Sequence, residues 1–251
     1  MKLQQHLLWY GECATSSLPD RISQTPCSHS SFTVATYGIA SIIKLSMATV
    51  NIIIRPPSFS AANPPLGYQS PTLAWLTETW HVTHSTLPMW KNKRNVRIQY
   101  TPLPPSTGSN SAASETDRID DLVTYQGLTG DKVTTLHGVD KLSTTTSTGS
   151  NGQAKDAWDW RGKGWLKIAG SHWEVLGWGE EVATGNKWVV TEFAKTLFTP
   201  AGVDVYSQRP EGLQQITLEG IKRALEGTGD ENVKRMAVEL FEIKRDDARN
   251  D

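Results

Sequence analysis

Short stretches in which apolar and polar residues alternate recur along the chain from Trp75 onward. They are rich in Val, Ile, Thr and aromatic residues and are separated by turn residues, which is typical of β-strands. We predict eight strands, at 78–86, 95–102, 119–126, 133–141, 157–168, 172–179, 187–197 and 202–208. Short connections between consecutive strands favour an all-β fold, an eight-stranded up-and-down antiparallel β-barrel, because closure leaves no exposed sheet edge.

The spacing of apolar residues changes after Pro210. Between Leu213 and Leu225 they recur at near-helical intervals, and the sequence GTGD that follows supplies a stop and then an N-cap at Asp230. A second apolar stripe leads from there to Phe241. The pattern therefore predicts two C-terminal helices packed on the barrel.

A shift in composition near Pro71 predicts the domain organisation. Residues 1–70 contain four basic and two acidic residues, whereas the remainder contains 21 basic and 24 acidic residues. We expect 1–70 to be a largely disordered extension and 71–251 to be the barrel domain with its helices. Because MATVNIII from Met47 would itself make a plausible beginning, a mis-extended gene model for 1–46 stays open. The polar stretches 104–117 and 143–155 predict mobile loops.

Charge and cysteine content narrow the function classes. The net charge is −1 at pH 7, without a block of basic residues interleaved with aromatics, so we expect no nucleic-acid partner. The only cysteines, Cys13 and Cys27, lie far from the aromatic-rich part, which excludes a disulfide framework there and a cysteine-ligated zinc site. No stretch suits a secretory signal or a membrane span, so we expect a cytoplasmic protein without stable membrane insertion.

Several motifs resemble the lipocalin/calycin superfamily. ETWHVTHSTLPMW is similar to the lipocalin first strand, where a tryptophan lies at the closed end of the barrel, and VRIQY and VTTLHGVD resemble the second and fourth strands. The C-terminal part, from VDVYSQRP into a helix and a Gly-Asp break, is similar to bacterial and apolipoprotein-D type lipocalins. The resemblance covers about residues 75–243 and implies a ligand-binding barrel.

The chain also departs from the lipocalin pattern. Glu78 stands where the family has glycine, and Arg209 lies one residue later than the family arginine that stacks over the barrel tryptophan, here Trp80. The family's Thr-Asp-Tyr turn is replaced by GEEVATGNKW. The density of tryptophan also resembles lipocalin-like fungal proteins, some of which are similar to cyclases of biosynthetic pathways.

Side chains two positions apart on a strand share one face of a barrel. If Trp80 points inward, Val82 and His84 therefore do too. The pattern leaves open which face of the sixth and seventh strands is interior. A carboxylate inside a closed barrel is costly unless it is paired or meets a ligand, so Glu174 or Glu192 would mark a site if inward.

Most of the tryptophans are interpreted as core packing, with a few lining a cavity. The candidate ligand-binding residues combine these aromatics with nearby polar groups. They are Trp80, His84, Tyr100, Trp158, Trp160, Arg161, Trp173, Glu174, Trp188 and Glu192. His84 and Glu174 are also the candidates for catalysis, although a structural role for His84 and a solvated Arg161 stay open.

The sequence thus favours a protein that binds a small hydrophobic molecule in a barrel cavity. One alternative is a cofactor-free isomerase or cyclase of a secondary-metabolite pathway that uses the same cavity. A second is a haem-binding, nitrobindin-like barrel, which requires an inward histidine. Otherwise we expect no cofactor and no metal, because the histidines lack convergent spacing. The sequence does not determine the oligomeric state.

Overall fold

The computed structural model describes residues 51–104, 117–143, 156–197, 199–246 and 248–249. The predicted polar loops lie mostly outside these ranges, as does the predicted extension up to residue 50. The chain divides into two units, Met1–Ser46 and Met47–Asp251, and the barrel belongs to the second.

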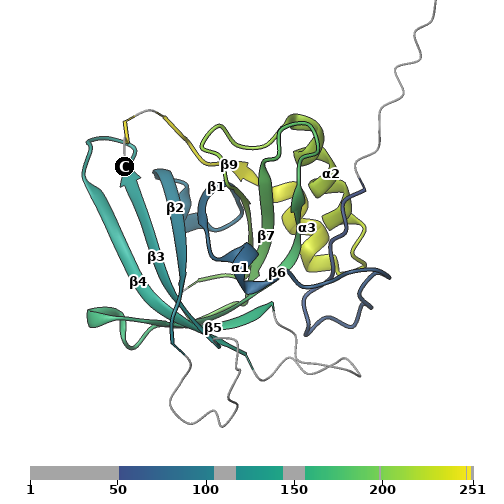
Figure 1. The fold of residues 1–251 in the computed structure, drawn as a ribbon, viewed down its shortest axis with the longest axis horizontal. Helices are drawn as coiled ribbons and strands as arrows, with labels where there is room; N and C mark the ends of the chain where they lie inside the picture. Colours follow the sequence, from purple (N-terminus) through teal and green to yellow (C-terminus); the bar gives the residue numbers. More distant parts are fainter. Residues whose placement is uncertain (1–50, 105–116, 144–155, 198, 247, 250–251) are drawn as a thin grey trace, which may run out of the picture. The chain divides into compact units, whose positions relative to one another are not determined.

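Eight consecutive antiparallel strands close into a barrel (Figure 1). They are β1 (Thr79–Ser85), β2 (Lys93–Pro102), β3 (Arg118–Gly127), β4 (Val133–Leu142), β5 (Ala157–Gly162), β6 (Gly170–Glu180), β7 (Lys187–Phe193) and β8 (Gly202–Ser207). Each strand pairs with the next, and β1 pairs with both β2 and β8. The predicted up-and-down barrel of lipocalin type is therefore confirmed.

Two predicted strands end earlier than expected. β5 stops at Gly162, because the chain folds back there into a short 3-10 helix, η2 (Gly164–Leu166), and a Cβ at Gly162 would lie 2.4 Å from the Leu166 carbonyl oxygen. β7 ends at Phe193 rather than at residue 197. Smaller elements that the pattern did not predict are α1 (Leu73–Leu76), η1 (Pro88–Trp90) and β9 (Phe241–Glu242).

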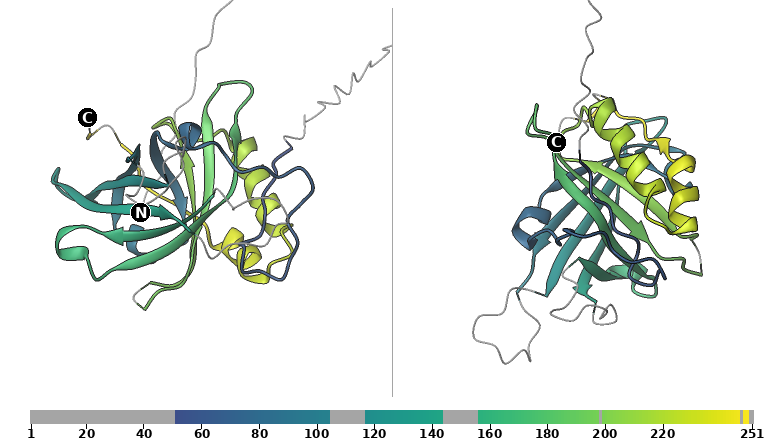
Figure 2. Two further views of the ribbon diagram at one scale, coloured as in Figure 1. Left: turned by 60° about the horizontal axis from the view of Figure 1, so that its bottom comes forward. Right: turned by 90° about the vertical axis from the view of Figure 1, so that its right-hand side faces the viewer.

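Both C-terminal helices are present and lie side by side on the barrel at β6–β8, away from β3 and β4 (Figures 1 and 2). They are α2 (Gln215–Glu226) and α3 (Glu231–Glu239). Asp230 is the N-cap of α3, as predicted, and its carboxylate accepts from the amides of Asn232 and Val233 at 2.9 and 3.0 Å. Within the described residues, no helix is both long and apolar enough to cross a membrane.

Part of the segment before the barrel packs on β6. Ile54 pairs with Gly177, and the Arg55 amide donates to the Leu176 carbonyl at 2.8 Å. Glycine is required at 177, because a Cβ there would lie 2.7 Å from the Ile54 side chain. The domain boundary near Pro71 stays a prediction, but residues 51–70, which it groups with the extension, include a segment held against the barrel.

Burial occurs on both faces of β6–β8, because one face lines the barrel and the other is covered by the helices. The interior cluster includes Trp80, Ile98, Tyr100, Ile119, Trp158, Trp173, Val189 and Tyr206. The outer cluster includes Ile54, Leu176, Trp188, Val190, Val205, Ile221, Leu225 and Met236. A buried side chain on these strands is therefore not necessarily inside the barrel.

Candidate functional site

The predicted site residues divide between the two faces of the barrel wall. Trp80, Tyr100, Trp158, Trp160 and Trp173 belong to the interior cluster. The outer side holds His84, Arg161, Glu174, Trp188 and Glu192, judged from their strand partners and contacts. The ligand-binding role of all ten residues stays a prediction, but the second group does not line the interior.

A β-bulge explains why His84 is not inward. The pairing register of β1 with β8 shifts between Val82 and His84, which reverses the alternation of faces after Val82. His84 lies opposite Val205, a residue of the outer cluster, while the next residue, Ser85, bonds to the interior Asp204. Burial, with Arg245 and Lys222 nearby, lowers the pKa of His84 to about 4, so it is neutral near pH 7.

Trp80 is fully buried in the interior cluster, and its indole nitrogen has a hydrogen-bond partner nearby. Its indole N–H donates to the Leu76 carbonyl at 2.9 Å, and its ring lies 5.3 Å from that of Trp75. The structure does not show the expected stacking of Arg209 over the Trp80 ring. Arg209 instead donates to the Thr184 carbonyl at 2.6 Å. Trp80 is therefore held beside α1 and Trp75, and its place at the closed end of the barrel stays a prediction from the resemblance.

Three interior aspartates each accept a hydrogen bond from a tryptophan indole, and the sequence interpretation missed all three. Trp173 Nε1 donates to Asp140 Oδ1 at 2.8 Å, and Trp90 Nε1 to Asp204 Oδ2 at 3.3 Å. The third pair is Asp121 with Trp160. Strand alternation could have revealed them, because Asp121 shares a face with Ile119, and Asp204 with Tyr206.

The Trp160 indole fits against Asp121 because position 138 has no side chain. Gly138 lies opposite Asp121 on the neighbouring strand, and a Cβ on it would come within 2.1 Å of Trp160 Nε1. Gly138 therefore leaves the space that the indole occupies.

Burial raises the pKa of the interior acids, so they stay protonated at a higher pH than they would in water. It raises the pKa of Asp204 to about 7, although the bonds from Ser85 and Trp90 oppose this. Burial also raises the pKa of Asp121 and Asp140, and the charge of Asp121 raises that of Asp140 further. Ionising both carboxyl groups at once is unfavourable, because each negative charge opposes the other.

Polar atoms of this interior group are left without a partner among the described residues: Asp121 Oδ1, Asp140 Oδ2 and Trp158 Nε1. Buried polar atoms are almost always hydrogen-bonded in proteins. Beside them, the rings of Tyr100 and Trp173 stack at 5.4 Å, and those of Trp158 and Trp173 at 6.1 Å. The interior therefore offers an aromatic surface with one indole donor and two carboxyl groups that can donate or accept.

Glu174, the other predicted catalytic candidate, belongs to an ion-pair network on the outer face. Its carboxylate accepts from Arg55 Nη1 at 2.7 Å, from the Ser58 amide at 2.9 Å and from His172 Nε2 at 3.2 Å. Burial raises the pKa of Glu174, but these bonds and the Arg55 charge outweigh it and lower the pKa to about 2. This fully paired carboxylate fastens residues 55–58 to β6, so a role as a proton donor does not suit it.

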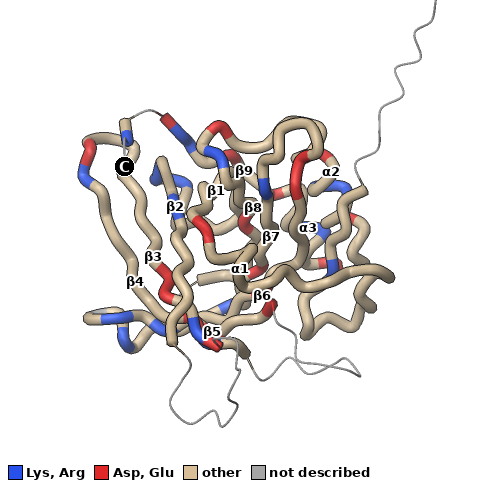
Figure 3. Tube along the Cα trace, viewed as in Figure 1, with Lys and Arg blue, Asp and Glu red and all other residues tan. Residues whose placement is uncertain are grey.

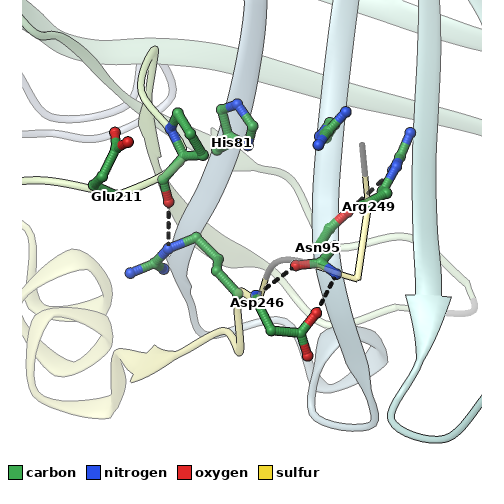
Figure 4. A pocket seen from close by; sticks show the side chains of 8 residues that line it. His81, Asn95, Glu211, Asp246 and Arg249 are labelled. Atoms are coloured by element: carbon green, nitrogen blue, oxygen red, sulfur yellow. Dashed lines mark hydrogen bonds between the residues drawn. The ribbon is translucent and has the colours of Figure 1, made fainter. Parts of the chain in front are cut away.

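A pocket of about 360 Å³ lies outside the barrel, beside β1 and β2 (Figure 4). His81 faces it together with Arg249, Glu211 and the bonded pair Asn95 and Asp246. Burial and the charges of nearby arginines lower the pKa of His81 to about 4. Figure 3 shows basic and acidic positions interspersed along the described strands.

None of the four histidines in the described ranges faces the interior. His81 lines the outer pocket, His84 lies on the outer face, His137 bonds to Asp120 at 2.8 Å, and His172 bonds to Glu174. Haem binding of the nitrobindin kind needs an inward histidine, and the described residues provide none. Nor do they bring three His, Cys, Asp or Glu side chains together in a way that could hold a metal ion.

Comparisons with known proteins find one curated relative at low identity. The chain is 26% identical over 208 residues to Botcinic acid biosynthesis cluster B protein 12 of Botryotinia fuckeliana, which covers 80% of this chain and 87% of the relative. No family model matches the chain.

Similar solved structures include lobster apocrustacyanin A1, with a TM-score of 0.47, 8% identity, and coverage of 78% of this chain and 92% of that one. The amine binding protein of Rhodnius prolixus, solved with tryptamine, has a TM-score of 0.42 and 13% identity, covering 68% of this chain and 83% of that one. These likenesses are too distant to carry functional arguments. The chain's own strand order, closure and C-terminal helices establish that it has a lipocalin-like barrel fold.

Proposed function

We propose that the barrel interior binds a small, mostly apolar molecule that carries oxygen-containing groups. The observation that carries this proposal is the set of buried polar atoms without a protein partner, Asp121 Oδ1, Asp140 Oδ2 and Trp158 Nε1, beside stacked aromatic rings. Leaving such atoms unsatisfied costs on the order of 1–3 kcal/mol each. A ligand that bonds to them recovers this cost.

The lining favours a flat molecule with a carbonyl or hydroxyl oxygen. The nearly parallel Tyr100 and Trp173 rings, with an interplanar angle of 12°, provide an apolar wall against which a planar ring can stack. The Trp158 indole can only donate, whereas a carboxyl group donates when protonated and accepts when ionised. An eight-stranded barrel is about wide enough for one small ligand.

The paired acids also favour a second candidate, a cofactor-free isomerase or cyclase. Of two neighbouring buried carboxyl groups that share a proton, the protonated one can donate to a substrate carbonyl oxygen while the ionised one accepts a proton from the adjacent carbon. The product of this step is an enol, and return of a proton to another carbon completes an isomerisation. The relative named after a biosynthesis cluster supports this setting but does not establish a reaction for this chain.

The test of binding is native mass spectrometry of the purified protein after incubation with a polyketide and terpenoid extract. We expect the wild type to retain a small molecule and Asp140→Asn and Trp158→Phe to retain at least tenfold less. Arg161→Ala, which changes an exposed residue of the outer face, should retain as much as the wild type. Equal retention by all four proteins would contradict a site in the interior.

Analysis of the extract for products separates the carrier from the enzyme. A carrier returns its ligand unaltered. An isomerase or cyclase yields a new product of unchanged mass, and that product should disappear with Asp121→Asn and Asp140→Asn. Product formation that persists in both variants would contradict catalysis by the acid pair.

A further inference from the structure

A cleft of about 690 Å³ lies outside the barrel, between α3, the connections β1–β2 and β7–β8, and residues 57–59. Its walls include the apolar residues Phe59, Val233, Met236 and Phe241. Glu192 of β7 also lines it. Glu192 alternates along its strand with Thr191 and Phe193, and Phe193 packs against the interior cluster, so Glu192 faces away from the barrel interior.

Glu192 is unusually placed for a carboxyl group. It is 1% exposed, and its Oε2 atom has no hydrogen-bond partner among the described residues. Directly opposite on the neighbouring strand is Glu174, whose charge is neutralised by Arg55 and whose oxygens are bonded. Of the two buried glutamates, only Glu174 has its ion-pair partner within the described structure.

The charges around Glu192 favour a positively charged group beside it. Burial raises the pKa of Glu192 to about 8, and the charges of Glu174 and Asp230 add to the rise, while those of His172 and Arg55 oppose it. A cation next to the carboxylate offsets this negative surplus, whereas an anion adds to it. None of the three basic residues that line the cleft supplies this cation. Lys91 lies over the Phe241 ring at 5.7 Å, and Arg235 pairs with Glu239 at 2.9 Å. Lys195 is exposed to solvent.

We propose that this cleft is a second ligand site, in which Glu192 binds the ammonium group of a small amine whose apolar body lies against Phe59, Met236 and Phe241. Binding ionises the Glu192 carboxyl group, and its proton leaves to the solvent. The site is separate from the barrel interior and does not depend on the function proposed there.

Isothermal titration calorimetry of the full chain at pH 7 with n-hexylamine tests the proposal, with 1-hexanol and hexanoate as probes of equal chain length. We expect hexylamine to bind at least tenfold more tightly than either control. Glu192→Gln should weaken hexylamine at least tenfold, and Glu231→Gln, which removes an exposed carboxylate of α3 outside the cleft, should change it less than twofold.

Proton release in the wild type gives a readout that does not depend on any variant. In buffers of different ionisation enthalpy, the heat of binding should reveal about one proton released per hexylamine bound. Hexylamine binding unaffected by Glu192→Gln, preferential binding of hexanoate, or binding without proton release would each overturn the proposal.

Discussion

At the scale of single residues, the interior acids depend on close-fitting neighbours, and Gly138 is the sharpest case. Gly138→Ala places a methyl group where the Trp160 indole lies and displaces it from Asp121. We expect a loss of about 1–3 kcal/mol in the free energy of unfolding, measured with urea. Gly127→Ala on β3, where the nearest atom would be an ordinary 3.5 Å away, should cost less than about 0.5 kcal/mol. Equal costs for the two variants would contradict the fit.

Asp204 gives a prediction on pH dependence. Its pKa is raised from 3.8 to about 7 by burial, so the folded state holds this proton more tightly than the unfolded chain. Its contribution to stability is complete below about pH 4 and is lost as the pH rises to about 7. As the pH rises from 5 to 8, we expect the free energy of unfolding of the wild type to fall more than that of Asp204→Asn. The difference should be on the order of 2–3 kcal/mol. Parallel urea-unfolding profiles for the two proteins would refute the raised pKa.

The sequence offered several of the interior aromatics as candidates without fixing their strand faces, and it missed the interior acids. Tyr100, Trp158, Trp160 and Trp173 are inside, as strand alternation allowed. Asp121, Asp140 and Asp204 were missed because a buried acid is recognised only when its strand face is known. His84 was assigned to the wrong face because a one-residue bulge leaves no clear mark in the pattern.

At the scale of elements, the ion pair of Arg55 with Glu174 determines how the segment before the barrel is held on β6. Arg55→Ala leaves the buried Asp156 carboxylate without its cation, and leaves the fully buried Glu174 with His172, at 3.2 Å, as its remaining basic partner. We expect a loss of about 3–5 kcal/mol in unfolding free energy, because an unpaired buried charge is costly. The double variant Arg55→Met/Glu174→Gln removes the charges of Arg55 and Glu174 and leaves only Asp156 without its cation, so it should lose less than the single variant. If both variants lose the same amount, the pairing is not what stabilises the segment.

Element type and the packing of the two helices on the barrel were predictable from the sequence, whereas the strands that they cover and the packing of the preceding segment were not. All eight strands and both helices could be predicted from residue spacing, since alternation and helical periodicity are local properties. The sequence did not indicate that residues 54–58 pack on β6, or that α2 and α3 cover β6–β8 in particular. This packing buries Trp188, Glu174 and Glu192 on the outside. These three residues looked like interior candidates for that reason.

At the scale of the whole barrel, the wall separates two chemically distinct environments. Inside, aromatic rings surround acids whose pKa values are raised, whereas outside, Glu174 is ionised and fastens the preceding segment. Ligand binding inside should therefore affect the interior tryptophans and leave the outer Trp188 unchanged.

Indole N–H resonances of the ¹⁵N-labelled protein test this central claim most directly, with the molecule that native mass spectrometry recovers from the extract as titrant. The account predicts that the signals of Trp158, Trp160 and Trp173 shift on titration while that of Trp188 does not. Assignment by single Trp→Phe variants identifies each signal. Shifts confined to Trp188, or the absence of any shift at interior tryptophans when the molecule is bound, would contradict a ligand site inside the barrel.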